Sequence, residues 1–282
     1  MILEHKQLDL YGKKVFEMMI FKPPMTIHNL LDNKACFLHI IEGESLTISE
    51  IERASLHSQD SVLMKCGSYI SNMLPVKGGN YFHSFAIHFH LEVLEELYKN
   101  EFPRLFKNPP NIPVSNFIRV GNKELINHFI RGMMLYFKTP KNLIPEDLLK
   151  LKLKEILILL FQLDDTNRIH DILTSLFSPS TYTIKQIVEA HLYLNISVEE
   201  LASLCNMSIS TFKREFKKTY DYPPAAYMKS RKLERAKEQL EITDKRIMEI
   251  AFDCGFTDVS HFSKCFVEKY GQNPSKYRGR AK

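Results

Sequence analysis

The chain of 282 residues has few of the features that mark membrane, secreted or disordered proteins. Its longest apolar run, residues 156–161, is far shorter than the roughly 20 residues that cross a bilayer, and the N-terminus lacks an apolar signal segment. The five cysteines are an odd number and are scattered along the chain, with neither CxxC pairs nor the density of a disulfide scaffold. With only 10 Gly and 13 Pro, the chain is neither collagen-like nor low-complexity. We expect a soluble, cytoplasmic, globular protein with reduced cysteines and no membrane contact.

Basic residues are unevenly distributed along the chain. Residues 1–180 carry 20 Lys and Arg against 20 Asp and Glu, whereas residues 181–282 carry 18 against 13. The whole net charge of +5 therefore lies in the last third. A cationic C-terminal segment is typical of proteins that meet a polyanion such as nucleic acid. The length, at roughly 150 residues a domain, favours two domains.

The hydrophobic pattern changes along the first two thirds of the chain. Apolar and polar residues alternate over 14–21, 35–41, 46–51 and 82–90. This alternation, with turn residues between the segments, predicts an antiparallel β-barrel or sandwich. A helical period follows, over 91–99, 122–138, 145–163 and 166–177. The Ser178-Pro179-Ser180-Thr181 stretch then predicts a linker, with one domain over 1–178 and an all-helical one over 182–282.

The C-terminal part contains an internal repeat. Aromatic and proline residues recur at an offset of 50, so that Phe212, Phe216, Tyr220, Pro224 and Tyr227 match Phe262, Phe266, Tyr270, Pro274 and Tyr277. Upstream, Leu201, Ala202 and Cys205 match Ile250, Ala251 and Cys254 at an offset of 49, so one residue is inserted at the turn. Two copies indicate a duplicated supersecondary unit in which each copy is helix, short turn, helix.

Capping residues and apolar spacing orient each helix pair. Ser197 and Glu200 form a capping box before the first helix, and Ser208 and Asp258 cap the second helix of each copy. Apolar residues predict the inward stripes Ile209, Phe212, Phe216 and Tyr220, and Phe262 and Phe266. The outward faces then carry Ser210, Lys213, Arg214 and Lys217 in the first copy, and Ser260, Ser263 and Lys264 in the second. Such helices have the chemistry to enter a DNA major groove.

A long helix is predicted between the two copies. It begins at Pro223-Pro224 and continues to about Leu240, roughly 24 Å at 1.5 Å per residue. A strut of this length would place the two outward helices near the 34 to 36 Å repeat of one DNA turn. Its basic side chains are expected to contact the DNA backbone, and they are Lys229, Arg231, Lys232, Arg235 and Lys237.

Residues 246–278, RIMEIAFDCGFTDVSHFSKCFVEKYGQNPSKYR, resemble the signature of the AraC/XylS family of bacterial transcription regulators. The sequence departs from this signature at three places. His261 stands where Tyr is usual, and Cys265 and Val267-Glu268 stand where a more basic run is common. In the first copy, Asp221 stands in place of the usual Gly. The resemblance implies a seven-helix DNA-binding domain with two helix-turn-helix lobes over about 183–280. It also implies recruitment of RNA polymerase at promoters. By position it assigns DNA contacts to Ser210, Lys213, Arg214, Val259, Ser260, Ser263 and Lys264.

The N-terminal part resembles the cupin-like domain that precedes the DNA-binding domain in many family members. The segments CFLHIIEGESLTI and FAIHFHLEVLEELY carry the likeness, and CGSYIS is similar to the version in type III secretion activators. In the family this domain binds a small effector or a regulatory protein and often dimerises. The sequence does not decide between these two kinds of regulator.

Two features of this part suggest chemistry, but neither is complete. His88 and His90 share one face of a strand, as metal ligands do in cupin enzymes, yet the further ligands that such a site needs are not evident. Cys66 has no acid or base partner at a recognised spacing. We therefore expect no metal, no cofactor and no catalytic activity.

The helix over 145–163 has a seam that suits pairing of two helices. Apolar residues at steps of 4, 3, 4 and 3 make up this seam, namely Leu149, Leu153, Ile156, Leu160 and Leu163. One interpretation is that the seam joins two subunits of a homodimer. The other is that the helix packs against the barrel of its own chain, because other faces are apolar too. Both can hold together, with one face inward and one between subunits.

The prediction as a whole is an α+β chain with a cupin-like antiparallel β-barrel and following helices, then an all-α domain with two helix-turn-helix lobes joined by a long helix. The predicted function is sequence-specific DNA-binding transcription regulation, as an activator under control of an effector or regulatory protein. Promoter DNA, RNA polymerase and a second copy of the chain are the expected partners. The alternative is a cupin-type metalloenzyme or small-molecule binder fused to a helical interaction module.

Overall fold

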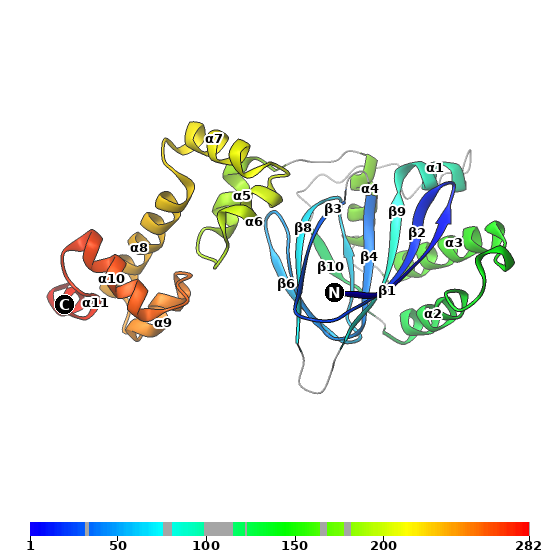
Figure 1. The fold of residues 1–282 in the computed structure, drawn as a ribbon, viewed down its shortest axis with the longest axis horizontal. Helices are drawn as coiled ribbons and strands as arrows, with labels where there is room; N and C mark the ends of the chain where they lie inside the picture. The colour runs from blue at the N-terminus through cyan, green and yellow to red at the C-terminus, as the bar shows by residue number, and fades with distance from the viewer. Residues whose placement is uncertain are drawn as a thin grey trace. The chain divides into compact units, whose positions relative to one another are not determined.

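The chain folds into two compact units, Met1–Thr181 and Tyr182–Lys282 (Figure 1). The computed structural model describes residues 1–31, 34–75, 81–98, 115–121, 123–163, 168–177 and 182–281. Among the helices of these residues, none combines the length and the apolar character that crossing a bilayer requires. The predicted linker at 178–181 lies outside the described residues.

The first unit is built on two antiparallel sheets. One has the order β1 (Ile2–Leu10), β2 (Lys13–Phe21), β9 (Phe82–His90), β4 (Lys34–Glu42), β7 (Ser61–Met64) and β10 (Phe117–Arg119). The other has the order β3 (Met25–Leu31), β8 (Gly67–Leu74), β5 (Glu44–Ile48) and β6 (Arg53–His57). The predicted antiparallel β architecture is therefore confirmed, with β2, β4, β5 and β9 at the predicted strands.

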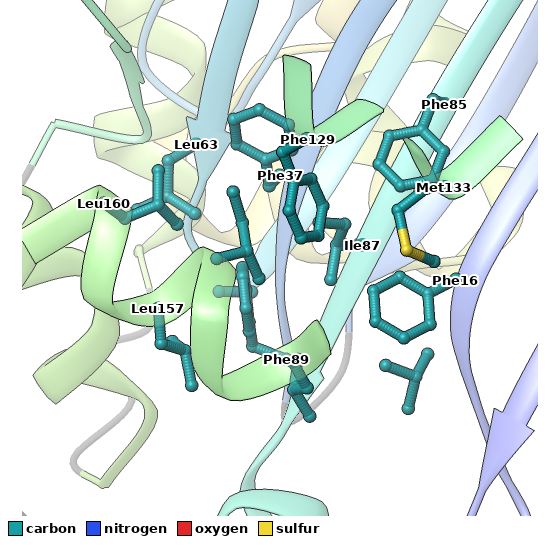
Figure 2. Packing of buried hydrophobic residues seen from close by; sticks show 14 of the residues in the cluster. Phe16, Phe37, Leu63, Phe85, Ile87, Phe89, Phe129, Met133, Leu157 and Leu160 are labelled. Carbon is teal, nitrogen blue, oxygen red and sulfur yellow. The ribbon is translucent and has the colours of Figure 1, made fainter. Parts of the chain in front are cut away.

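Helices cover one face of the six-stranded sheet. They are α1 (Leu91–Tyr98), α2 (Lys123–Tyr136), α3 (Glu146–Gln162) and α4 (Arg168–Thr174). Phe85, Ile87 and Phe89 of β9 share one hydrophobic cluster with residues of α2 and α3, including Met133 and Leu157 (Figure 2). The alternate residues of β9 line the space between the two sheets. Because both faces of β9 are covered, nearly the whole strand is buried.

The seam of α3 belongs to the core of its own unit. Leu149, Leu153, Ile156 and Leu160 are at most 5% exposed, and Leu163 packs against the same cluster. These side chains pack inside their own unit, which agrees with the second interpretation, packing against the β structure of the same chain. A role of the seam in joining two subunits stays a prediction. The exposed face of α3 instead carries Leu151 and Ile158, which are 64% and 54% exposed.

The second unit is all-helical, as predicted. Its described residues, 182–281, form α5 (Ile184–His191), α6 (Val198–Leu204), α7 (Ile209–Tyr220), α8 (Pro224–Ile242), α9 (Ile247–Asp253), α10 (Val259–Tyr270) and α11 (Pro274–Ala281). We call α5 to α7 the first lobe and α9 to α11 the second lobe, and α8 joins them. The resemblance to the AraC/XylS signature implied seven helices, and seven helices fill this range.

The internal repeat is visible in the packing of the aromatic rings. In the first lobe the ring of Phe216 lies 5.6 Å from Phe212, 4.5 Å from Tyr220 and 5.6 Å from Tyr227. The equivalent distances from Phe266, to the residues 50 positions further on, are 5.7, 4.6 and 5.5 Å. α7 and α10 are thus each held by an equivalent cluster of four rings.

Candidate nucleic-acid interface

Both helix-turn-helix units are closed by a residue in the left-handed region and by a capped second helix. Asn206 in the first lobe and Gly255 in the second have φ of 51° and 79°. Ser208 caps α7 by accepting a hydrogen bond from the backbone N–H of Thr211 (3.2 Å). Asp258 caps α10 by accepting two, from Ser260 (3.0 Å) and His261 (2.9 Å). These caps satisfy N–H groups that a helix start leaves open.

The structure places the predicted DNA-contacting residues on the open faces of α7 and α10. Phe212, Phe216, Phe262 and Phe266 are completely buried and hold the opposite faces. The exposed members of the predicted set are Ser210, Lys213, Arg214, Lys217, Ser260 and Lys264, whereas Val259 and Ser263 are partly buried. Ile209, predicted to face inward, is 42% exposed, because it stands at the first residue of α7, before the helix meets the core.

The two open faces differ in charge. α7 carries Lys213, Arg214, Lys217 and Lys218 against a single acid, Glu215. Glu215 lies 3.1 Å from Arg214 Nε and 2.9 Å from Lys218 Nζ, which lowers the pKa of Glu215. Lys213 and Lys217 line a groove with the Pro223-Pro224 start of α8. The first lobe therefore presents the stronger positive field.

The basic residues of α8 do not all face solvent as predicted. Lys232 is partly buried, and its Nζ donates to the carbonyl oxygens of Leu194 (2.8 Å) and Gly255 (3.1 Å). The guanidinium of Arg235 lies 4.1 Å from the centre of the Tyr193 ring. Both side chains make contacts inside the unit, so the structure gives them a role other than the predicted DNA backbone contact.

A cavity of about 140 Å³ lies between the two sheets of the first unit. Its apolar lining comes from both sheets and includes Met19, Phe21, Ile27, Met64, Met73 and Phe82. Its polar lining includes Lys14, Glu17, Lys34 and His88. The volume is close to that of the roughly 150 Å³ cavity that accommodates benzene in another protein.

Glu17 is the centre of a buried polar cluster at this cavity. Its carboxylate is 4% exposed and lies 2.7 Å from His5 Nε2, 2.8 Å from His88 Nε2 and 2.5 Å from Lys14 Nζ. Burial raises the pKa of Glu17, but the hydrogen bonds from His88 and Lys14 outweigh burial and lower it to about 2. Sequence reasoning missed Glu17, although a lone acid inside the apolar strand KKVFEMMIF was a signal for it.

His88 and His90 are held by hydrogen bonds of the barrel itself. Burial lowers the pKa of both. Nε2 of His88 pairs with Glu17, and Nε2 of His90 donates to the carbonyl oxygen of Lys14 (2.8 Å). In the described residues, Nδ1 of His88 is buried without a hydrogen-bond partner. Among the residues that the structure describes, no group of three His, Cys, Asp or Glu could hold a metal ion.

The CGSYIS segment has a structural explanation that the sequence did not supply. Gly67 has a φ of +153°, and a Cβ there would collide with the carboxylate of Glu50. That carboxylate accepts hydrogen bonds from Ser68 N (2.5 Å) and from Asn116 Nδ2 (2.5 Å). The hydroxyl of Tyr69 donates to the carbonyl oxygens of Lys65 and Asn116. Cys66 directly precedes this buried network and is in no disulfide.

Comparisons with known proteins agree with both units. Residues 201–280 match the family model of a helix-turn-helix domain. Residues 35–172 match the model of the ExsA N-terminal regulatory domain. The two models together leave only the first strands, the linker region with α5, and the chain end unmatched.

Similar proteins are transcription regulators. The chain is 40% identical over 83 residues to the HTH-type transcriptional activator RhaS of Mannheimia succiniciproducens, which covers 29% of this chain and 31% of that protein. It is 36% identical over 100 residues to the HTH-type transcriptional regulator GbdR of Pseudomonas aeruginosa, with 36% and 27% covered. The matches thus span about a third or less of these curated relatives. A solved structure of a probable AraC family transcriptional regulator from Rhodopseudomonas palustris is 27% identical, covers 35% of this chain and 94% of that chain, and has a TM-score of 0.31. The chain therefore belongs to the AraC/XylS family of transcription regulators.

Proposed function

We propose that the chain is a sequence-specific DNA-binding transcription regulator that acts as an activator and binds promoter DNA through α7 and α10. The observation that carries the proposal is the pair of equivalent capped helices, each with a buried aromatic face and an open hydroxyl and basic face. Base contacts are assigned to Ser210, Arg214, Ser260, Ser263 and Lys264, with Val259 against an apolar base edge, and phosphate contacts to Lys213 and Lys217. No catalytic role is assigned to any residue.

The test is the salt dependence of DNA binding by the full-length chain. Affinity for random duplex DNA is expected to fall by at least roughly tenfold between about 50 and 200 mM salt, the loss that the two assigned phosphate contacts give by themselves. The double variant Lys213→Ala/Lys264→Ala is expected to bind more weakly with a shallower salt slope. Lys245→Ala, an exposed lysine whose Nζ pairs with Asp253 at 2.6 Å, is the matched control and should bind like wild type. A flat salt response of wild type contradicts the proposal.

For control through the first unit we propose a small effector in the cavity between the sheets. An apolar body suits the methionine and phenylalanine lining, and a hydroxyl or N–H donor suits the unpartnered Nδ1 of His88. Phenol has this chemistry at the right size and is a suitable probe. It should raise the melting temperature of wild type but not of Ala86→Leu, in which the added side chain fills the cavity. An equal rise in both proteins would favour a regulatory protein as the controlling partner.

RNA polymerase and a second copy of the chain complete the proposed set of partners, in the cytoplasm. Because the core side of α3 is occupied, a homodimer contact through this helix must use Leu151 and Ile158. Leu151→Asp/Ile158→Asp is then expected to sediment as a monomer. Leu135→Asp, at a 63% exposed position of α2, is the control. An unchanged mass of the double variant would place any dimer contact elsewhere.

A further inference from the structure

Lys232 lies where the two lobes of the second unit meet. Its ammonium bonds the carbonyl oxygen of Leu194, in the connection between α5 and α6, and that of Gly255, in the turn between α9 and α10. One charged group thus holds a backbone oxygen of each lobe at 2.8 and 3.1 Å. Hydrogen bonds from a charged donor are about twice as strong as neutral ones, and partial burial protects these two from water.

Two neighbouring contacts strengthen this junction. A Cβ on Gly255 would stand 2.5 Å from the carbonyl oxygen of Tyr193, so the turn of the second lobe touches the backbone of the first. In the same connection, the ring of Tyr193 has the guanidinium of Arg235 of α8 at 4.1 Å from its centre. The helix α8 therefore holds the connection after α5 with two of its own basic side chains, and of these two Lys232 also donates a hydrogen bond to the second lobe.

We propose that Lys232 is a positioning residue that fixes the distance and rotation between α7 and α10, and thereby the single spacing of two DNA half-sites that the chain accepts. This inference rests on the proposed DNA binding. Two linked modules gain affinity only when both engage at once, and a rigid link confines that gain to one geometry. A loosened link keeps both half-site contacts but distributes the gain over several spacings.

The test starts by selecting duplexes from a random library with the full-length wild-type chain. Binding is then measured on the selected duplex and on versions with one base pair inserted or removed between the half-sites. Insertion turns the half-sites by about a tenth of a helical turn. Wild type is expected to lose affinity about tenfold, whereas Lys232→Met should vary by less than about threefold across the series. Lys245→Met, which removes an equal charge from the segment after α8 where the ammonium lies 2.6 Å from Asp253, should behave like wild type.

The outcomes separate this inference from the proposed function. If wild type enriches no sequence, the DNA-binding function is overturned. If it enriches two half-sites and Lys232→Met shows the wild-type spacing profile, the positioning role is overturned while DNA binding stands. Half-sites without a preferred spacing in wild type also overturn the positioning role. If Lys232→Met has no cooperative thermal transition, Arg235→Gln decides, with a smaller broadening expected and an unchanged profile contradicting the inference.

Discussion

The two lobes of the second unit share the packing of their buried aromatic rings but differ in the charge of their exposed faces. The three distances from the central ring, Phe216 or Phe266, agree to within about 0.1 Å. The outer pair is looser in the second lobe, where the rings of Tyr270 and Tyr277 lie 6.1 Å apart against 4.5 Å for Tyr220 and Tyr227. Their open faces have diverged, because α7 carries four basic residues and one acid, whereas α10 carries Lys264, Glu268 and Lys269. Lys269 is already engaged with Glu234 at 2.8 Å. The comparison teaches that the buried face is held to a geometric requirement and the open face is not, so function is to be sought where the copies differ.

The largest expected effect tests the shared plan. Phe216→Ala and Phe266→Ala each remove a completely buried ring at the centre of its cluster, and each should cost about 3–5 kcal/mol in the free energy of unfolding. Because the clusters are equivalent, the two costs should be similar. Urea unfolding followed by circular dichroism measures them. A difference of more than about 2 kcal/mol would show that the lobes are not energetically equivalent.

The second prediction separates the turns. Ala at position 206 or 255 must adopt a left-handed backbone, which costs about 1 kcal/mol at either place. At 255 the new Cβ also meets the carbonyl oxygen of Tyr193. Gly255→Ala should therefore cost about 2–3 kcal/mol and Asn206→Ala only about 1. Equal losses in urea unfolding would mean that the backbone contact between the lobes is not close in solution.

The third prediction concerns the open faces and has a smaller effect. Each phosphate contact contributes about 0.9 to the slope of log K against log salt concentration. Lys213→Ala/Lys217→Ala should lower the magnitude of the slope by nearly two, and Lys264→Ala by at most one. The measurement is a salt titration of duplex binding by the full-length chain. A larger change from Lys264→Ala would reverse the ranking of the lobes.

The sequence predicts which side chains are buried better than it predicts what they pack against. Large apolar side chains at helical spacing must be buried somewhere, so the stripe through Phe212 and Phe262 was predicted correctly. Periodicity does not say what covers a face, which is why the sequence left two interpretations of the α3 seam open. The strand β1 was missed because it is mostly exposed, with only Leu8 and Leu10 buried.

Contacts to backbone atoms were beyond sequence reasoning altogether. Lys232 bonds two carbonyl oxygens, and every residue has a carbonyl, so nothing at Leu194 or Gly255 marks them as partners. The cluster around Glu17 joins residues 5, 14, 17 and 88, which only the pairing of β1, β2 and β9 brings together. The sequence thus predicts the exposed faces of α7 and α10, but not the contacts between distant segments that fix the positions of these helices.

The smallest expected effect distinguishes the caps of the two recognition helices and depends on pH. Hydrogen bonds from the backbone N–H groups of His261 and Ser260 lower the pKa of Asp258, the cap of α10. The cap of α7 is Ser208, whose hydroxyl does not titrate. A carboxyl whose pKa is lower in the folded state stabilises above its ordinary value of 3.8, and this contribution is lost as pH falls through the lowered pKa. Asp258→Ser should lower the melting temperature at neutral pH by about 3 °C and have no effect at the acid end. The matched exchange Ser208→Asp should raise the melting temperature at neutral pH, and this gain should also vanish at the acid end. If the melting temperature of each variant differs from wild type by the same amount at every pH, the charge of the cap contributes nothing.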